Sequence, residues 1–275
     1  MKYIDLFSGI GGFHLAMEKN NFEMVMACEK NEKARQTYKE NFGEKYDLEN
    51  ETIFPKDVTL LNEKDIPDFD ILCAGFPCQA FSRAGKQKGF EDTRGTLFFD
   101  VARILKEKQP EYFILENVSN LLNHDNGKTF EIISNTLSEL GYFFDFKVIK
   151  LSDHGLPQYR PRIYIIGSKS KKELNFPNKI DLKYNMSNIL EGECKREIGF
   201  TLRVGGRHSP INDRHNWDGY IVDNKEVRLN TEQAKKMQGF PEYFKFKVSE
   251  NQAMKQLGNS VSPEIVDQLI KSFII

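Results

Sequence analysis

The fold of this chain is decided at residues 69–79, Phe-Asp-Ile-Leu-Cys-Ala-Gly-Phe-Pro-Cys-Gln. Residues 70–75 form a short apolar run between turn residues, which predicts a buried central strand. Pro77 cannot extend a strand, and it favours extended geometry at the residue before it. The chain therefore leaves the sheet here and carries Cys78 on a loop at the carboxyl end of the strand. Open α/β sheets bind their ligands at that edge.

Cys78 is a candidate nucleophile because of this position. The thiolate is the reactive form, and a free thiol with a pKa of about 8.5 is mostly protonated at neutral pH. A buried structural cysteine is the competing interpretation, since free cysteine is among the most buried residue types. The surrounding segments decide between the two.

Strand-like and helix-like segments alternate from the amino terminus to Gly167. The predicted strands are Lys2–Phe7, Met24–Glu29, Asp70–Gly75, Tyr112–Val118, Phe143–Leu151 and Arg162–Gly167. The predicted helices are Gly12–Lys19, Glu32–Asn41, Thr96–Lys108 and Lys128–Leu140. This alternation predicts an α/β domain with a largely parallel sheet covered on both faces.

The pattern breaks down from Ser168 to about Val227, where Lys, Asn, Gly and Pro replace periodic apolar residues. We expect a small irregular domain there, and a helix over Pro263–Phe273 that returns the chain to the first domain. The predicted division is a first domain of residues 1–167 completed by 248–275, and a small domain with its hinge over 168–247.

The composition is that of an ordinary globular protein, with 275 residues, 29% charged residues and a mean hydropathy of −0.54. We expect no membrane span and no signal peptide, because no apolar run has the necessary length. The four cysteines have no metal-ligand spacing, so we expect no metal and a reduced cytoplasmic setting.

Charge is divided unevenly along the chain. Residues 147–247 contain 20 Lys and Arg against 12 Asp and Glu, a net of +8, while the remainder has 19 against 28, a net of −9. Such asymmetry predicts one lobe that faces a polyanion, although a solvated basic surface would give the same count.

A glycine-rich turn at residues 5–12, Asp-Leu-Phe-Ser-Gly-Ile-Gly-Gly, ends one predicted strand and opens a helix. Glu29 ends the next strand, at the separation from Gly9 at which an acidic residue would bind ribose hydroxyls. His14 occupies the third glycine position of a dinucleotide fingerprint, so the match is imperfect. The turn and Glu29 together predict an adenosine-containing cofactor, with S-adenosylmethionine and NAD both open at this point.

Together these segments resemble the DNA (cytosine-5) methyltransferases, and the stretch 70–104 is most similar to small prokaryotic restriction–modification enzymes. The resemblance covers about residues 1–167 and 228–275; residues 168–227 match less and are shorter than the family pattern. Its motifs, in order, are Asp5 to Gly12, Glu29, Gly75 to Gln79, Glu116-Asn117-Val118, Gln158 to Arg162, Arg228 to Pro241, and Gln256 to Val261. The resemblance implies a Rossmann-like methyltransferase fold, a mixed and mostly parallel sheet with helices on both faces, plus a small irregular target-recognition domain.

The resemblance also implies a mechanism. Cys78 would add to C6 of cytosine, so that C5 can attack a methyl sulfonium. Glu116 would meet N3 in its protonated form, and Arg162 and secondarily Arg160 would hold the base and order the site. We assign no side chain to removal of the C5 proton.

The implied cofactor is S-adenosylmethionine, with S-adenosylhomocysteine as product. The residues that match family cofactor positions are Phe7, Gly9, Gly11, Glu29, Asp57, Asn259 and Val261.

The implied partner is double-stranded DNA with its target cytosine flipped out, because a stacked base is inaccessible to a thiol. A basic, glycine-containing segment over 82–95 is predicted to close over the DNA, and the small domain to read the sequence. The candidate contacts are Ser82, Arg83, Lys86 and Arg94 in that segment, and Thr201, Arg203, Arg207 and Arg214 in the small domain. We expect a monomer; a cognate restriction endonuclease, where one exists, would act on the same site without direct contact.

Three other functions stay open on the sequence: a tRNA cytosine-5 methyltransferase, a noncatalytic nucleic-acid-binding module on a methyltransferase scaffold, and a dinucleotide oxidoreductase. The separate basic segment after residue 168 favours DNA over tRNA. Intact Cys78, Glu116 and Arg162 argue against a dead scaffold, and only the glycine-rich turn supports the oxidoreductase.

Overall fold

The computed structural model describes residues 1–77 and 96–275. Cys78 and four of the predicted DNA contacts, Ser82, Arg83, Lys86 and Arg94, lie outside the described residues.

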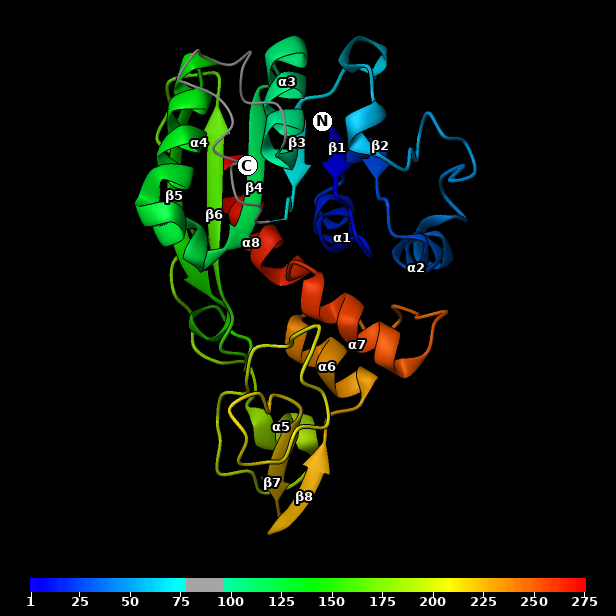
Figure 1. The fold of residues 1–275 in the computed structure, drawn as a ribbon, viewed down its shortest axis with the longest axis vertical. Helices are drawn as coiled ribbons and strands as arrows, with labels where there is room; N and C mark the ends of the chain where they lie inside the picture. Colours follow the sequence, from blue (N-terminus) through cyan, green and yellow to red (C-terminus); the bar gives the residue numbers. More distant parts are fainter. Residues whose placement is uncertain (78–95) are drawn as a thin grey trace.

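The larger lobe alternates strands and helices along the chain (Figure 1). Its elements are β1 Lys2–Leu6, α1 Gly12–Lys19, β2 Glu23–Cys28, α2 Glu32–Phe42, β3 Ile71–Ala74, α3 Leu97–Lys108, β4 Tyr112–Val118, α4 Lys128–Glu139, β5 Phe143–Lys150, β6 Pro161–Ser168 and α8 Pro263–Phe273. Short 3-10 helices are η1 Val58–Leu60, η2 Glu63–Asp65, η3 Ser119–Gly127 and η4 Leu151–Asp153. Every strand and helix expected between Lys2 and Gly167 is confirmed, and the ends differ by no more than a single position.

The strands of the larger lobe form one sheet in the order β2-β1-β3-β4-β6-β5. Strands β2, β1, β3 and β4 are parallel, as the alternation predicts, whereas β6 is antiparallel to both β4 and β5. The physical reason is the connection between β5 and β6. It contains no crossover helix, and a short connection without one joins antiparallel neighbours.

Helices cover both faces of the sheet because its central strands are apolar on both sides. Successive residues of a strand point to opposite faces. On β3, Leu72 belongs to the core beneath α3 and α4, and Cys73 belongs to the core that includes α1, α2 and α8. The second of these cores continues into the small lobe. The prediction of an α/β sheet covered on both faces is confirmed.

The small lobe is more regular than the sequence suggested. It contains α5 Met186–Leu190 and an antiparallel hairpin of β7 Gly219–Val222 and β8 Lys225–Arg228. Asp223 and Asn224 take the left-handed conformation, with φ of 48° and 61°, which is the geometry of a two-residue hairpin turn. Trp217 is almost completely buried there, so it does anchor the small core.

Two further helices, α6 Thr231–Gln238 and α7 Glu250–Asn259, lie between the lobes (Figure 1). Neither helix was predicted from the sequence. Signals for α6 were present: Asn230 and Gln233 form a reciprocal capping box, and Gly239 ends the helix with a φ of 80°.

The start of the predicted small domain stays attached to the larger lobe. Ser168 Oγ donates to Glu111 Oε1 at 2.8 Å, and Lys172 Nζ donates to the Phe273 carbonyl. Within the described residues, no helix has the length and apolar character needed to cross a membrane.

Candidate active site

The glycine-rich turn and the end of β2 are joined by one carboxylate. Glu29 accepts a hydrogen bond from the Gly9 amide at 2.9 Å and another from the Asn31 amide at 2.6 Å. Burial raises the pKa of Glu29, and the amide donors of Asn31 and Gly9 oppose that shift. Phe7 and Gly9 both have positive φ, so the backbone turns sharply between β1 and α1. Glu29 therefore holds two loops together at the carboxyl edge of the sheet.

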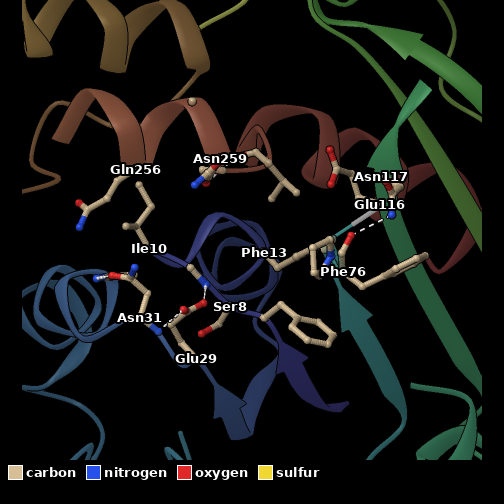
Figure 2. A pocket seen from close by; sticks show the side chains of 18 of the residues that line it. Ser8, Ile10, Phe13, Glu29, Asn31, Phe76, Glu116, Asn117, Gln256 and Asn259 are labelled. Atoms are coloured by element: carbon tan, nitrogen blue, oxygen red, sulfur yellow. Dashed lines mark hydrogen bonds between the residues drawn. The ribbon is translucent and has the colours of Figure 1, made fainter. Parts of the chain in front are cut away.

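A cavity of about 470 Å³ opens beside this turn, a size typical of small-molecule sites. Its wall comes from the ends of β1, β2, β3 and β4 on one side, and from α7 and the two residues that follow it on the other (Figure 2). The predicted cofactor and catalytic residues that line it are Phe7, Gly9, Glu29, Asn259, Val261, Glu116, Arg160 and Arg162. Side chains from near both ends of the chain thus meet in one hollow.

Gly11 and Asp57 are not among the residues that line the cavity. Gly11 has a φ of 91°, and a Cβ there would lie 2.3 Å from the Phe42 ring, so its place is in the packing beneath the turn. Asp57 caps η1 through the Thr59 amide and pairs with Lys30 Nζ at 2.6 Å. The cofactor roles expected of Gly11 and Asp57 stay predictions.

Glu116 and Arg162 form an ion pair at the end of the cavity next to β4. Arg162 Nε lies 3.1 Å from Glu116 Oε1, and both side chains are largely buried. Burial raises the pKa of Glu116, while Arg162 and then Arg160 oppose that shift. The site therefore contains a carboxyl group that holds its proton to a higher pH than usual, next to a fixed cation.

The residue after Glu116 fixes the loop that leads to Cys78. Asn117 Nδ2 donates to the Phe76 carbonyl at 2.8 Å, and Asn117 is buried. This bond ties the end of β4 to the end of β3, one residue before Pro77. In the sequence Asn117 stands out only as the middle residue of the motif Glu116-Asn117-Val118.

Arg160 makes its described hydrogen bonds to backbone carbonyls. It is almost completely buried, and its guanidinium donates to the carbonyls of Leu202, Gly258 and Ser260 at 2.8–3.1 Å. Burial, with Arg162 nearby, lowers its pKa to about 9. Its described bonds join two segments of backbone, at residue 202 and at residues 258–260, and a contact with the base stays a prediction.

The predicted DNA contacts of the small lobe fall into two groups. Arg203 and Arg214 are exposed and make no ion pair with any residue that the structure describes. Arg207 is mostly buried; it lies 2.7 Å from Glu250 Oε1 and 3.8 Å from the buried Asp218. Thr201 is half-buried, and its hydroxyl donates to the Tyr159 carbonyl. Arg203 and Arg214 thus have no acidic partner among the described residues, while Arg207 holds the lobe to α7.

Lys255 was missed by the sequence analysis. It projects from α7, is exposed, and lines both the 470 Å³ cavity and a second hollow of about 300 Å³. That second hollow lies between α7 and residues 203–208. Lys255 has no ion-pair partner in residues 1–77 and 96–275, so its charge faces the junction of the two hollows.

No group of three or more His, Cys, Asp or Glu side chains in the described part of the chain is arranged to hold a metal ion.

Solved structures share this fold. A mutant DNMT2 from Spodoptera frugiperda has a TM-score of 0.76 at 20% identity, and the match covers 98% of each chain. The Dnmt2 methyltransferase of S. pombe has a TM-score of 0.72 at 22% identity over 98% of this chain and 97% of that one. The architecture is that of the S-adenosylmethionine-dependent methyltransferases.

Sequence relatives are more specific. The model of the C-5 cytosine-specific DNA methylases matches residues 1–203 and 191–274. The chain is 39% identical to the type II methyltransferase M.HhaI of Haemophilus parahaemolyticus, over 95% of this chain and 90% of that protein. It is 41% identical to M.NgoBI of Neisseria gonorrhoeae, over 97% and 90%. The chain belongs to the C-5 cytosine-specific DNA methylases and is a DNA cytosine-5 methyltransferase.

Proposed function

We propose that this enzyme transfers a methyl group from S-adenosylmethionine to C5 of a cytosine that is flipped out of a short, specific duplex sequence. One observation carries the proposal. A single cavity has Glu29 and the glycine-rich turn at one end and the Glu116–Arg162 pair at the other, and Pro77, the residue before Cys78, lines it too. The cofactor and the base would meet in that hollow.

The residues present fit the cofactor. Ser8 Oγ is buried at the cavity wall with no hydrogen-bond partner in the described residues, which leaves a polar atom for a ligand. Glu29 and Asn31 supply polar atoms beside it, and Phe7 and Ile10 supply apolar surface. These residues would hold S-adenosylmethionine, which supplies an electrophilic methyl group. We propose no metal.

Cys78 would begin the reaction. Its thiolate adds to C6, the ring electrons move so that C5 becomes nucleophilic, and C5 takes the methyl group. Loss of the C5 proton to a base then reforms the ring double bond and expels the thiolate. Every atom added to the ring except the methyl carbon and its hydrogens is released again.

Glu116 would act on N3 of the same base. Its raised pKa favours the protonated carboxyl, which can donate a hydrogen bond or a proton as negative charge builds at N3. Arg162 at 3.1 Å stabilises the carboxylate that proton transfer leaves behind. With Arg162 beside it, Glu116 can therefore be both protonated and charged in the course of one turnover.

The DNA would lie against the basic lobe. Arg203, Arg214 and Lys255 carry charges that no acidic side chain of the described residues neutralises, which supports phosphate or base contacts. Flipping the cytosine costs a few kcal/mol, which the protein must recover in contacts to the base and backbone. We further propose a monomeric, cytoplasmic enzyme that protects DNA from a cognate restriction endonuclease acting at the same site.

The proposal is tested by incubating plasmid DNA with the purified protein and S-adenosylmethionine, followed by bisulfite sequencing. We expect protected cytosines at one short sequence, and none with Cys78→Ser. The matched control is Cys194→Ser, a half-buried thiol of the small lobe, which should methylate normally. Methylation by Cys78→Ser would contradict the covalent mechanism.

The rival substrate is tested in parallel. Methyl incorporation into tRNA but not into duplex DNA would show that the substrate is tRNA and not DNA. A duplex with 5-fluorocytosine at the target should become covalently trapped on the protein only when the cofactor is present.

A further inference from the structure

A closed ring of buried hydrogen bonds connects Leu202, which lies beside predicted DNA contacts, to Ser260 in the wall of the 470 Å³ cavity. It is built from two glutamine side chains, one arginine and two backbone segments. On one side of the ring, Leu202 N donates to Gln158 Oε1 at 3.1 Å, Gln158 Nε2 donates to Gln238 Oε1 at 2.7 Å, and Gln238 Nε2 donates to the Ser260 carbonyl at 2.9 Å. On the other side, Arg160 closes the ring: its Nη2 donates to the same Ser260 carbonyl at 2.8 Å, and its Nη1 donates to the Leu202 carbonyl at 3.1 Å.

The ring is shielded from water. Gln158 and Gln238 are 0% exposed and Arg160 is 1% exposed. A buried polar group that loses its partner costs more than the bond itself contributes, so the members of such a network move together or not at all. The ring is therefore a stiff connection between the segments that it joins.

The two backbone segments of the ring are adjacent to residues with different predicted ligands, DNA for one and the cofactor for the other. Leu202 lies between Thr201 and Arg203, the predicted DNA contacts. Ser260 lies between Asn259 and Val261, which line the cofactor cavity. The segments also touch directly, since a Cβ on Gly258 would lie 2.8 Å from the Arg203 carbonyl carbon.

We propose that Gln158 and Gln238 are positioning residues that couple cofactor binding to DNA binding. This inference rests on the proposed function, because it assigns the cofactor to the cavity and DNA to residues 201–203. A cofactor that orders residues 258–261 also orders residues 201–203 through the ring, so DNA has less to order when it binds second. The coupling is reciprocal, as linkage requires.

The test measures the dissociation constant of the duplex that bisulfite sequencing identifies, with and without saturating S-adenosylhomocysteine. In the native enzyme we expect the product cofactor to tighten DNA binding about tenfold, within the range usual for coupled sites. Gln238→Met keeps the volume of the side chain and leaves Arg160 on the Ser260 carbonyl. The coupling ratio is the dissociation constant of the duplex without S-adenosylhomocysteine divided by that with it. We expect Gln238→Met to reduce this ratio to about twofold or less, with little change in the affinity for S-adenosylhomocysteine alone.

The matched control is Gln268→Met. Gln268 also makes two hydrogen bonds, both to His154, but it lies on α8 outside the ring. It should keep the full ratio. Gln158→Met breaks the ring at both Leu202 and Gln238 and serves as a second variant if Gln238→Met folds poorly. The double variant should lose no more coupling than either single one, because both interrupt the same connection.

The reverse measurement completes the test. The affinity for S-adenosylhomocysteine with and without the duplex must give the same ratio in every variant. A native enzyme with no coupling, a Gln238→Met variant with the native ratio, or equal losses in Gln268→Met would each overturn the inference. Absence of methylation by the native protein would overturn the proposed function as well, whereas normal methylation with unchanged ratios would overturn the ring alone.

Discussion

Glu116 is governed by two opposing influences on one carboxyl group. Burial disfavours its charged form and raises its pKa, while the Arg162 guanidinium at 3.1 Å favours that form. A carboxyl group in this balance can hold a proton and release it at small cost, as a general acid must.

Glu116→Gln tests this balance. We expect kcat to fall about a hundredfold or more, because an amide can donate a hydrogen bond to N3 but cannot deliver a proton. In the native enzyme, activity should also decline as pH rises through the raised pKa of Glu116, since the protonated form is lost. The kcat/KM profile of the variant should lack that alkaline decline.

The control for this variant is Glu111→Gln. Glu111 precedes β4, and its hydrogen bonds go to Ser168 and Ser170, away from the cavity lining. It should keep the native rate and pH profile. An unchanged profile in Glu116→Gln would exclude the proton-donor role.

His14 is a second residue in which burial sets the chemistry. It is 0% exposed, its Nδ1 lies 2.6 Å from the Tyr38 hydroxyl, and its ring stacks on Phe42. Burial, with Lys45 adding to it, lowers its pKa to about 3. Glu18, 3.9 Å away, is too distant and too exposed to reverse this. His14 is therefore a neutral core side chain in the third glycine position of the dinucleotide pattern.

Acid should destabilise the native protein through His14. Between pH 6.5 and about 3 the unfolded chain binds a proton at this residue and the folded chain does not, so stability falls as pH falls through 6.5. From pH 7 to pH 5 the expected loss is about 2 kcal/mol. Urea unfolding at both pH values should show this loss in the native protein and a loss smaller by that amount in His14→Asn. Equal losses in both would refute it.

Helix α1 shows how one glycine sets the start of an element. Gly11 is its N-cap, with a φ of 91°, and the Phe42 ring of α2 fills the space where a side chain would be. The backbone can therefore turn from β1 into α1 directly above α2, which brings Gly9 to Glu29.

Gly11→Ala should destabilise the protein by about 2–4 kcal/mol, from the left-handed backbone and from overpacking against Phe42. Gly205→Ala is the control, because a Cβ at Gly205 meets nothing within 4 Å. Thermal unfolding measures both. A Gly11→Ala protein of native stability that binds cofactor weakly would instead place Gly11 in the cofactor site.

At the scale of the whole molecule the excess of basic residues lies in residues 147–247, and the small lobe uses its arginines in two ways. Arg207 and Arg228 both contact Asp218, which is completely buried, so they hold the lobe together. Arg203 and Arg214 stay exposed. The number of basic residues in 147–247 does not by itself tell which arginines pair with Asp218 and which stay exposed.

Arg203→Ala and Arg207→Ala should therefore have different effects. Arg203→Ala should weaken DNA binding and reduce the slope of log K against log salt by about one, if it contacts a phosphate, without lowering the melting temperature. Arg207→Ala should lower the melting temperature by several degrees, because it leaves the buried Asp218 with one cation fewer. The salt dependence of duplex binding and thermal unfolding check the two. The reversed pattern would show that Arg207 faces the DNA.

The sequence by itself determined the order of elements and the location of the cavity. The apolar runs of β1, β3 and β4, and the turn residues after them, are local patterns that any chain with these neighbours would follow. Because parallel strands end at one edge, the motif residues Glu29 and Glu116 had to lie along that edge. The hairpin turn at Asp223-Asn224 and the capping box of α6 are also set by neighbouring residues, so both elements could have been predicted from the sequence.

Only the tertiary structure decided how the long side chains are used. Arg160 binds backbone carbonyls of residues that are distant in the sequence. Likewise, Asp57 pairs with Lys30 and Gln158 meets Gln238. A polar side chain takes whichever partner the folded chain brings within about 3 Å while it excludes water. That choice depends on how distant segments close upon one another, which no local spacing in the sequence records.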